Sequence, residues 1–347
     1  MSHQLEETAQ ALVAAGKGIL AADESTRTIG KRFAALGIPS TAETRRAYRQ
    51  MLFGTPDLSR YISGVILYDE TIRQTDDQGR PLAELVVQAG MIPGIKVDTG
   101  AKPLALCPDE KVTEGLDGLR ARLEEYRGRG ARFAKWRAVI KIGDDLPSAT
   151  CLDVNAQALA RYAALCQEQD LVPIVEPEVL MNGAHPLART EAVTSAVLVR
   201  VFAALRAQRV RLEGMLLKPN MVVPGKESDE PASVAAVAAA TMRVLRRTVP
   251  AAVPGIVFLS GGQDARQATV HLNAINLDEE GRPWRVTFSF ARALQDPALA
   301  AWNGRPSGVR AGQEALSHRA RCNSAATLGS YHDAMERRGT EPELTLH

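Results

Sequence analysis

The sequence is poor in the residue patterns that build metal sites and disulfide frameworks. Its four cysteines and six histidines are scattered along 347 residues, with no CxxC pair and no HExxH motif. Structural zinc sites and small disulfide-bonded folds place these residues at short, regular spacings. We therefore expect no metal and no cofactor, and a reducing compartment such as the cytoplasm.

Strong net charge and long apolar runs are also lacking. The 42 basic and 40 acidic residues leave a net charge of +2, which gives no bulk attraction to nucleic acid. The longest apolar candidate, Val193–Leu205, is interrupted by Arg200 and is too short to span a bilayer. The first residues, 1–18, mix Glu6 and Glu7 into a helical pattern without signal-peptide character. We expect no nucleic-acid partner and no membrane association.

What the sequence has is an alternation of short apolar runs and helix-length segments. The predicted strands are Gly18–Ala22, Ile62–Tyr68, Ile92–Val97, Ala131–Trp136, Val172–Val175, Gly214–Leu217, Gly255–Leu259 and Arg285–Phe290. The clearest predicted helices are Thr41–Phe53, Glu114–Arg127, Asn155–Gln169, Leu187–Arg209, Ala232–Arg247 and Gln263–Leu277. This pattern predicts an α/β fold, a (β/α)8 TIM barrel with additional N- and C-terminal helices.

The competing fold is a doubly wound open sheet. Such a sheet usually carries a GxGxxG turn after its first strand, and Gly16-Lys17-Gly18 lies too early and is too short to be one. We expect residues 1–338 to form a single barrel domain and residues 339–347 a short C-terminal tail.

Charged and hydroxyl residues follow nearly every predicted strand. The carboxyl ends of barrel strands are where active sites are built. Side chains alternate faces along a strand, so residues two apart, such as Lys135 and Arg137 or Glu176 and Glu178, point the same way. Polar caps of a solvated rim explain part of this pattern, but not the apolar residues directly before so many lysines and carboxylates.

Lys218 closes the apolar stretch LEGMLLK at 212–218, and Pro219 then removes the next N–H donor. A lysine in this position either forms a salt bridge or lies desolvated in a cavity. Desolvation and a neighbouring cation, for which Lys135 is the candidate, lower the pKa of an amine and make it a nucleophile. Asp23, Glu176 and Glu178 are candidates for the proton transfers that imine chemistry requires.

Two anion sites are predicted around this lysine. Ser260, Gly261 and Gly262 precede a helix, so that backbone N–H groups and the helix N-terminus favour a phosphate, with Arg292 as an added cation. The residues predicted for the second site are Ser25, Thr28, Arg32, Lys96 and Arg137. Two phosphate sites flanking one lysine suit a bisphosphorylated sugar.

Seven motifs in order make the sequence resemble the class I fructose-bisphosphate aldolases. They are GKGILAADEST at 16–26, GIKVDTG at 94–100, FAKWR at 133–137, IVEPEVL at 174–180, LLKPNMV at 216–222, FLSGGQ at 258–263 and FSFARALQ at 288–295. The resemblance implies a metal-independent homotetramer that cleaves fructose 1,6-bisphosphate reversibly to dihydroxyacetone phosphate and glyceraldehyde 3-phosphate, in glycolysis and gluconeogenesis.

The resemblance also implies roles for individual residues. Lys218 forms the imine with C2, Asp23 assists and takes the C4 hydroxyl proton, and Glu176 is the acid–base of carbinolamine dehydration. Glu178 and Lys135 tune the site. Ser260, Gly261 and Arg292 hold the C1 phosphate, and the five residues of the second anion site hold the C6 phosphate.

Some features depart from the family pattern. The sequence has Phe290-Ala291-Arg292 where relatives commonly have Tyr-Gly-Arg, and its tail, 341–347, lacks the family's terminal tyrosine. An altered scope, toward sedoheptulose 1,7-bisphosphate or fructose 1-phosphate, and a non-catalytic scaffold homologue are the alternatives. A metal-dependent aldolase is the alternative mechanism, and inactivation by EDTA would favour it.

Overall fold

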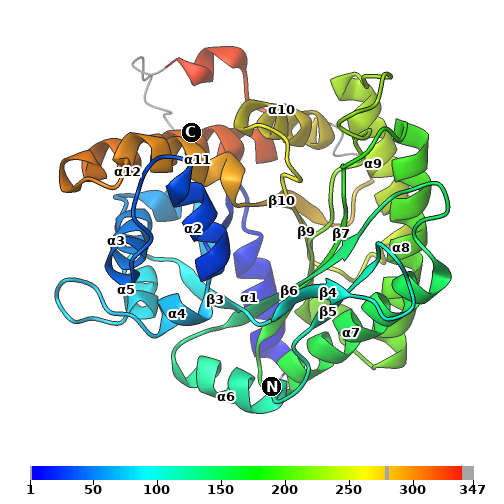
Figure 1. Cartoon of the computed structure of the whole chain (residues 1–347), viewed down its shortest axis with the longest axis horizontal. Helices are drawn as coiled ribbons and strands as arrows, with labels where there is room; N and C mark the ends of the chain where they lie inside the picture. The colour runs from blue at the N-terminus through cyan, green and yellow to red at the C-terminus, as the bar shows by residue number, and fades with distance from the viewer. Residues whose placement is uncertain (1, 278–280, 338–347) are drawn as a thin grey trace.

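A closed barrel of eight parallel strands forms the centre of the molecule (Figure 1). The structure is a computed structural model and describes residues 2–277 and 281–337. The strands lie in the order β1-β10-β9-β8-β7-β6-β3-β2, and the last closes on the first. Their bounds are β1 Gly18–Ala21, β2 Ile62–Leu67, β3 Ile92–Lys96, β6 Phe133–Ile140, β7 Val172–Val179, β8 Leu216–Leu217, β9 Gly255–Phe258 and β10 Arg285–Phe290. The predicted barrel fold and all eight predicted strands are confirmed.

Two strands continue further than predicted. β6 and β7 run on to Ile140 and Val179, with Arg137 opposite Glu176 and Val139 opposite Glu178. The prediction ended these strands at Trp136 and Val175, directly before the charged residues Arg137 and Glu176. It was wrong because those charges project from a continuing ladder. The opposite error occurs at β8, where Gly214 belongs to a 3-10 turn, Leu212–Gly214, and not to the strand.

Helices surround the barrel, and several begin at side-chain caps. Thr41 caps α3 through a reciprocal hydrogen-bond pair with Thr44, and the Ser233 side chain accepts from the Ala236 N–H at the start of α9. The helices of the surrounding layer are α2 Thr26–Ala34, α3 Ala42–Phe53, α4 Asp69–Ile72, α5 Leu82–Gln88, α6 Leu119–Gly128, α7 Ala149–Glu168, α8 Leu187–Ala207, α9 Val234–Thr248 and α10 Ala265–Asn276.

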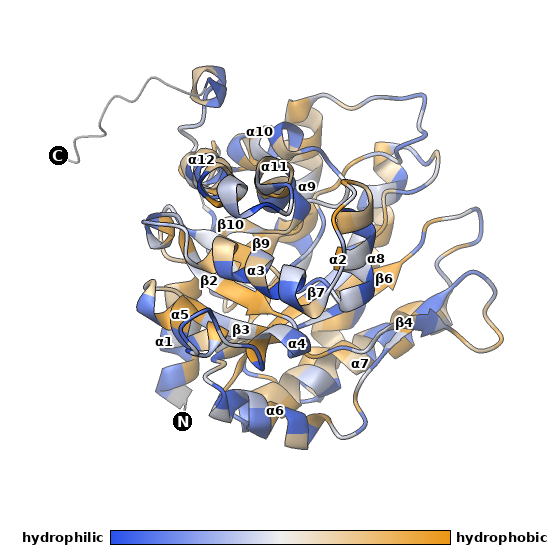
Figure 2. Ribbon diagram, turned by 60° about the vertical axis from the view of Figure 1, so that its left-hand side comes forward, coloured by the Kyte–Doolittle hydropathy of each residue, from blue (hydrophilic) through white to orange (hydrophobic). Residues whose placement is uncertain are grey.

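An antiparallel hairpin that was not predicted precedes α6. Its strands are β4, Gly100–Pro103, and β5, Lys111–Glu114, and Figure 2 shows the hairpin, marked by the β4 label, projecting away from the barrel with hydrophilic and hydrophobic segments. The predicted helix Glu114–Arg127 therefore starts too early, because Glu114 pairs with Gly100. The next helix, α7, starts before the predicted Asn155, because the Ser148 side chain caps it at the Cys151 N–H.

The additional terminal helices are present at both ends of the described chain. α1, Ser2–Leu12, packs its apolar face against the barrel's amino-terminal end, where its Leu5, Ala9 and Leu12 join an interior cluster with residues such as Phe133. Close approach there needs glycine, since a Cβ on Gly64 would lie 2.7 Å from Leu12 Cδ2. α1 thereby covers the amino-terminal end of the barrel interior.

At the other end of the chain, α11, Arg292–Trp302, and α12, Val309–Thr327, pack side by side (Figure 1). Two short 3-10 turns follow α11 and α12, Pro306–Gly308 and Asp333–Glu336 (η4), and a further one precedes β2, Leu58–Arg60. The predicted tail, 339–347, lies outside the described residues.

Substituting Gly18 by alanine is expected to destabilise the fold by about 1–3 kcal/mol. A Cβ on Gly18 would lie 2.5–2.6 Å from three atoms of the buried Phe288 ring, which has no room to retreat. The measurement is the free energy of unfolding from denaturant titration. Gly128→Ala is the control, because a Cβ at this helical position meets nothing within 4 Å. Equal stability of the two variants would show that the ring moves aside freely.

Candidate active site

Four charged side chains form a layer directly above the apolar interior of the barrel. Each follows an interior apolar residue of its strand by two positions: Asp23 after Ala21, Lys135 after Phe133, Glu176 after Ile174 and Lys218 after Leu216. Lys135 and Glu176 lie within β6 and β7 and therefore face the same way as those residues, whereas Asp23 and Lys218 come just after the ends of β1 and β8. All four are buried, with exposed fractions of 8% for Asp23, 5% for Lys135 and 3% for Glu176 and Lys218. The structure brings these predicted residues together.

Glu176 lies between the two lysines. Its Oε1 is 3.3 Å from the Nζ of Lys218, and its Oε2 is 3.3 Å from the Nζ of Lys135. Burial disfavours the ammonium of Lys218 and, with help from the Lys135 charge, lowers its pKa below the ordinary value, although Glu176 opposes this shift. Lys218 is thus the amine of the site that is easiest to deprotonate. The expected effect of Lys135 has the predicted sign, but burial is the larger cause.

Lys135 has the opposite electrostatics. Its Nζ lies 2.7 Å from Asp23 Oδ2 as well as 3.3 Å from Glu176. Burial penalises its charge, but the carboxylates of Asp23 and Glu176 outweigh burial and raise its pKa above the ordinary value. Burial likewise raises the pKa of Asp23, but the ammonium groups of Lys135, Lys96 and Lys218 reverse this and lower it well below the usual range. The site thus holds a Lys135–Asp23 ion pair beside a lysine whose pKa is lowered by burial.

Glu178 lies further up β7 and does not contact either lysine of the layer. Its Oε2 accepts a hydrogen bond from Arg137 Nε, and Asp98 Oδ2 accepts one from the Arg137 backbone N–H at 3.3 Å. Arg137 is partly exposed while Glu178 is buried. The pair orients a guanidinium at the mouth of the barrel.

The first predicted anion site lies on the loop after β9. Gly261 and Gly262 both have positive φ, 51° and 81°, a conformation that turns consecutive backbone N–H groups toward one concave side. The loop adjoins the Lys218 segment, because the Leu259 N–H donates to the Pro219 carbonyl at 3.1 Å. A cation that sequence reasoning missed, Lys226, covers it: a Cβ on Gly262 would lie 3.0 Å from Lys226 Nζ. Arg292, also predicted for this site, begins α11 and is exposed.

Three residues predicted for the second anion site, Ser25, Thr28 and Arg32, lie at the cap of α2 or within it. Ser25 caps this helix by accepting from the Thr28 N–H at 3.3 Å, and its hydroxyl lies 3.0 Å from that of Thr28. Lys96 Nζ lies 5.0 Å from the centre of the Tyr68 ring. Both Nη groups of Arg32 are engaged, one by Glu24 and one by Asp296 at 2.7 Å. Arg32 is therefore already held by carboxylates, which the sequence did not indicate.

A buried network that sequence reasoning missed supports the end of β1. Glu24, the neighbour of Asp23, lies 2.7 Å from Arg49 Nη1 and accepts from Gln295 Nε2 at 2.8 Å. Burial raises the pKa of Glu24, but Arg49 and Arg32 outweigh it and lower the pKa below the usual value. The only sequence signal was an arginine inside the otherwise buried face of α3.

Replacing Arg49 by methionine is expected to cost about 3 kcal/mol of stability, the lower end for breaking a buried ion pair, because the buried Glu24 carboxylate keeps only Arg32 as a cationic partner. Thermal and denaturant unfolding measure this loss. Arg46→Met on the same helix is the matched control: Arg46 pairs with exposed Glu43 and Asp77 and should cost about 1 kcal/mol or less. Similar losses in both variants would mean that Arg49 contributes no more than a surface pair.

Ser289 on β10 is a further residue without an assigned role. It is buried, and its hydroxyl has no hydrogen-bond partner among the residues that the structure describes. The sequence signal was only its place near the end of a predicted strand.

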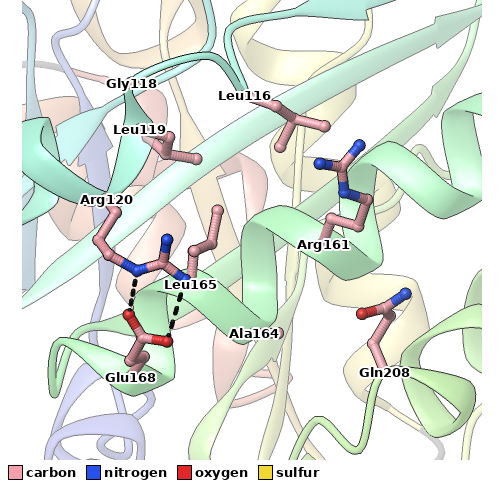
Figure 3. A pocket seen from close by; sticks show the side chains of 9 residues that line it. All are labelled: Leu116, Gly118, Leu119, Arg120, Arg161, Ala164, Leu165, Glu168 and Gln208. Atoms are coloured by element: carbon pink, nitrogen blue, oxygen red, sulfur yellow. Dashed lines mark hydrogen bonds and ion pairs between the residues drawn. The ribbon is translucent and has the colours of Figure 1, made fainter.

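A separate surface pocket of about 390 Å³ lies outside the barrel, between α6, α7 and the end of α8 (Figure 3). Arg120 and Glu168 form an ion pair along its wall, with Arg120 Nε 2.6 Å from Glu168 Oε1. None of the predicted site residues lines this pocket.

Within the described ranges, no helix is both long and apolar enough to cross a membrane.

A (β/α)8 barrel that buries a lysine of lowered pKa among carboxylates, at the carboxyl ends of its strands, defines a class of enzymes that act on carbonyl compounds through a lysine Schiff base. Residues 4–346 match the family model described as "Fructose-bisphosphate aldolase class-I". The chain therefore belongs to the class I fructose-bisphosphate aldolase family, which cleaves fructose 1,6-bisphosphate reversibly to dihydroxyacetone phosphate and glyceraldehyde 3-phosphate in glycolysis.

Similar proteins agree with this assignment. The "Probable fructose-bisphosphate aldolase class 1" of Xylella fastidiosa is 57% identical over 94% of this chain and 98% of its own. The cytoplasmic isozyme of fructose-bisphosphate aldolase from Cicer arietinum is 53% identical over 91% of this chain and 88% of its own. A solved fructose-bisphosphate aldolase from Plasmodium falciparum superposes with a TM-score of 0.94 at 49% identity, over 95% of this chain and 96% of that one.

Proposed function

We propose that Lys218 is the nucleophile of the aldol cleavage and forms the imine with C2 of the ketose. The observation that carries this assignment is a fully buried amine whose pKa is lowered by burial, with the Glu176 carboxylate 3.3 Å away. A free amine lone pair attacks the C2 carbonyl, and the resulting iminium is an electron sink that weakens the C3–C4 bond.

Glu176 is the proposed acid–base of imine formation. Its carboxylate lies 3.3 Å from Lys218 and accepts the proton that the Lys218 ammonium gives up to become a nucleophile. It then delivers this proton to the C2 hydroxyl of the carbinolamine, which leaves as water while the C=N bond forms and the carboxylate is restored. The Lys135 ammonium contacts the other oxygen of Glu176 and favours return of the carboxylate form. Lys135 thereby tunes both Glu176 and Lys218.

Asp23 is the proposed base for bond cleavage. It accepts the C4 hydroxyl proton while the C3–C4 electron pair moves into the iminium, which releases the aldehyde and leaves an enamine. Its lowered pKa keeps it ionised before that step. Glu178 acts through Arg137, whose guanidinium it orients.

The two ends of the substrate are proposed to bind on opposite loops. The positive-φ glycines 261 and 262, with Ser260 and Arg292, receive the C1 phosphate, and the nearby Lys226 adds a further positive charge. The proposed ligands of the C6 phosphate are Ser25, Thr28, Arg32, Lys96 and Arg137. Arg32 exchanges a carboxylate partner, Glu24 or Asp296, for phosphate when it serves this role.

Borohydride trapping with dihydroxyacetone phosphate, followed by peptide mass spectrometry, tests the proposal. Reduction of an imine leaves a stable secondary amine, and we expect it on the peptide that contains Lys218. An adduct on another lysine would move the nucleophile, and the absence of any adduct in folded protein would remove the covalent mechanism.

We further propose that the protein is cytoplasmic and assembles as a homotetramer. Relatives named as cytoplasmic or cytosolic aldolases, from Cicer arietinum and Arabidopsis thaliana, support the location. Light scattering on the purified protein tests the assembly, and a monomeric mass would contradict it. Fructose 1,6-bisphosphate is the proposed preferred substrate. Its kcat/KM against those of sedoheptulose 1,7-bisphosphate and fructose 1-phosphate decides the preference.

A further inference from the structure

Three metal-ligating side chains converge on α12, apart from the proposed catalytic residues. His318 and Cys322 lie one helical turn apart, and Glu336 of η4 lies against them. His318 Nε2 is 3.8 Å from Cys322 Sγ and 3.7 Å from Glu336 Oε2. Among the described residues, these three form the group of His, Cys, Asp or Glu donors whose ligand atoms all lie within 4.8 Å of one another.

The spacing is close to that of a tetrahedral zinc site. With metal–sulfur and metal–nitrogen bonds of about 2.3 and 2.0–2.1 Å, neighbouring ligand atoms lie roughly 3.4–3.6 Å apart. The two separations from His318 exceed this by a few tenths of an ångström, and the third, between Cys322 and Glu336, is within 4.8 Å. Small side-chain rotations would bring the three atoms to the spacing of a bound ion. His318 and Glu336 keep small exposed fractions of 13% and 24%, so an ion has a route from solvent to the buried Cys322.

The Glu336 carboxylate is held in place by Arg319 and Tyr331. Arg319 Nη1 lies 2.6 and 2.7 Å from the two oxygens of Glu336, and the Tyr331 hydroxyl donates to Oε1 at 2.8 Å. Arg319 is itself fixed, since Nη2 donates to Thr269 Oγ1 at 2.6 Å. A carboxylate has about four lone-pair sites, so Oε2 retains one for an ion. Such outer contacts orient metal ligands in known sites.

We propose that His318, Cys322 and Glu336 form a three-ligand site for Zn²⁺, with water as the fourth ligand. The thiolate and imidazole select zinc over magnesium or calcium, which prefer oxygen ligands alone. The ion fastens η4 to α12 and takes no part in aldol cleavage. The sequence alone indicated no such site, because only folding brings Glu336 to the two helix residues.

Metal titration of the full-length protein, stripped beforehand with EDTA, tests this site. Co²⁺ is the optical probe, and we expect one equivalent to bind with a thiolate-to-cobalt charge-transfer band that Zn²⁺ displaces. Zn²⁺ should also raise Tm. Cys322→Ser should abolish the band, and His318→Gln and Glu336→Gln should each weaken binding by at least about 100-fold, more than the usual loss of an outer contact.

Two controls identify where the metal binds. Cys107→Ser removes a partly exposed thiol outside the group, and His3→Gln removes an exposed histidine that faces Glu7 at 3.4 Å. Both should leave the band and the affinity unchanged. The proposal is overturned if the band is missing, if it depends on Cys107, or if His318→Gln and Glu336→Gln both bind as tightly as the parent. EDTA treatment should leave aldolase activity intact, and its loss would contradict a site outside the chemistry.

Discussion

Lys218→Ala should reduce the cleavage of fructose 1,6-bisphosphate by at least about three orders of magnitude, because no other group replaces the covalent path. The amine lies 3.3 Å from Glu176 and is buried, so its loss removes the nucleophile while Lys135 still neutralises the carboxylate layer. We expect a folded protein by circular dichroism. The measurement is the release of triose phosphate in a coupled assay, together with borohydride trapping, which should give no adduct.

Lys102→Ala is the matched control for that experiment. Lys102 is exposed on the β4–β5 hairpin, and its removal should leave both kcat and adduct formation unchanged. Residual turnover above about 1% in folded Lys218→Ala protein would place the nucleophile elsewhere. A silent parent protein, with no triose phosphate release, would instead favour the scaffold alternative.

Glu176→Gln is expected to lower kcat by about 10²- to 10⁴-fold, the usual contribution of a positioned acid–base group. The amide keeps the shape but neither donates the proton that dehydration needs nor accepts it back. Glu176 also raises the pKa of Lys218, so its removal leaves that pKa lower still. Borohydride trapping should therefore reach half its maximum at a lower pH than in the parent, although each turnover is slower. Single-turnover kinetics and trapping against pH measure the two effects.

Glu213→Gln is the control, because Glu213 is exposed and outside the carboxylate layer. It should reproduce the parent in both measurements. An unchanged kcat for Glu176→Gln would transfer the acid–base role to another group, and an unchanged trapping profile would show that Glu176 does not set the charge of Lys218.

The sequence by itself determined the barrel and indicated the residues to which we assign its chemistry. Short apolar runs separated by amphipathic helices have few compact solutions, and the strict alternation of side chains along a strand fixes which residues share a face. For that reason Lys135 was assigned to the same face as Arg137, and Glu176 to the same face as Glu178, from parity alone. The caps at Thr41 and Ser233 are likewise local interactions, because a cap and the N–H groups that it satisfies lie within one turn.

Only the tertiary structure decided the pKa shifts of the buried charged residues and the partners with which they pair. The lowered pKa of Lys218 depends on burial and on distances to Glu176 and Lys135, which come from three different strands. The pairing of Arg49 with Glu24 joins α3 to the segment after β1. The strand β5, which contains Glu114, forms only because it pairs with β4 at Gly100. Coulomb energies and desolvation depend on position in space, whereas a sequence records only order.

The metal-ligating group on α12 follows the same division. Helical spacing brings His318 and Cys322 onto one face, because residues four apart in a helix are neighbours on its surface. Glu336 arrives through η4, where Arg319 and Tyr331 hold its carboxylate. The pair of helix residues is local, but a third ligand requires a long-range contact that only the packed fold supplies.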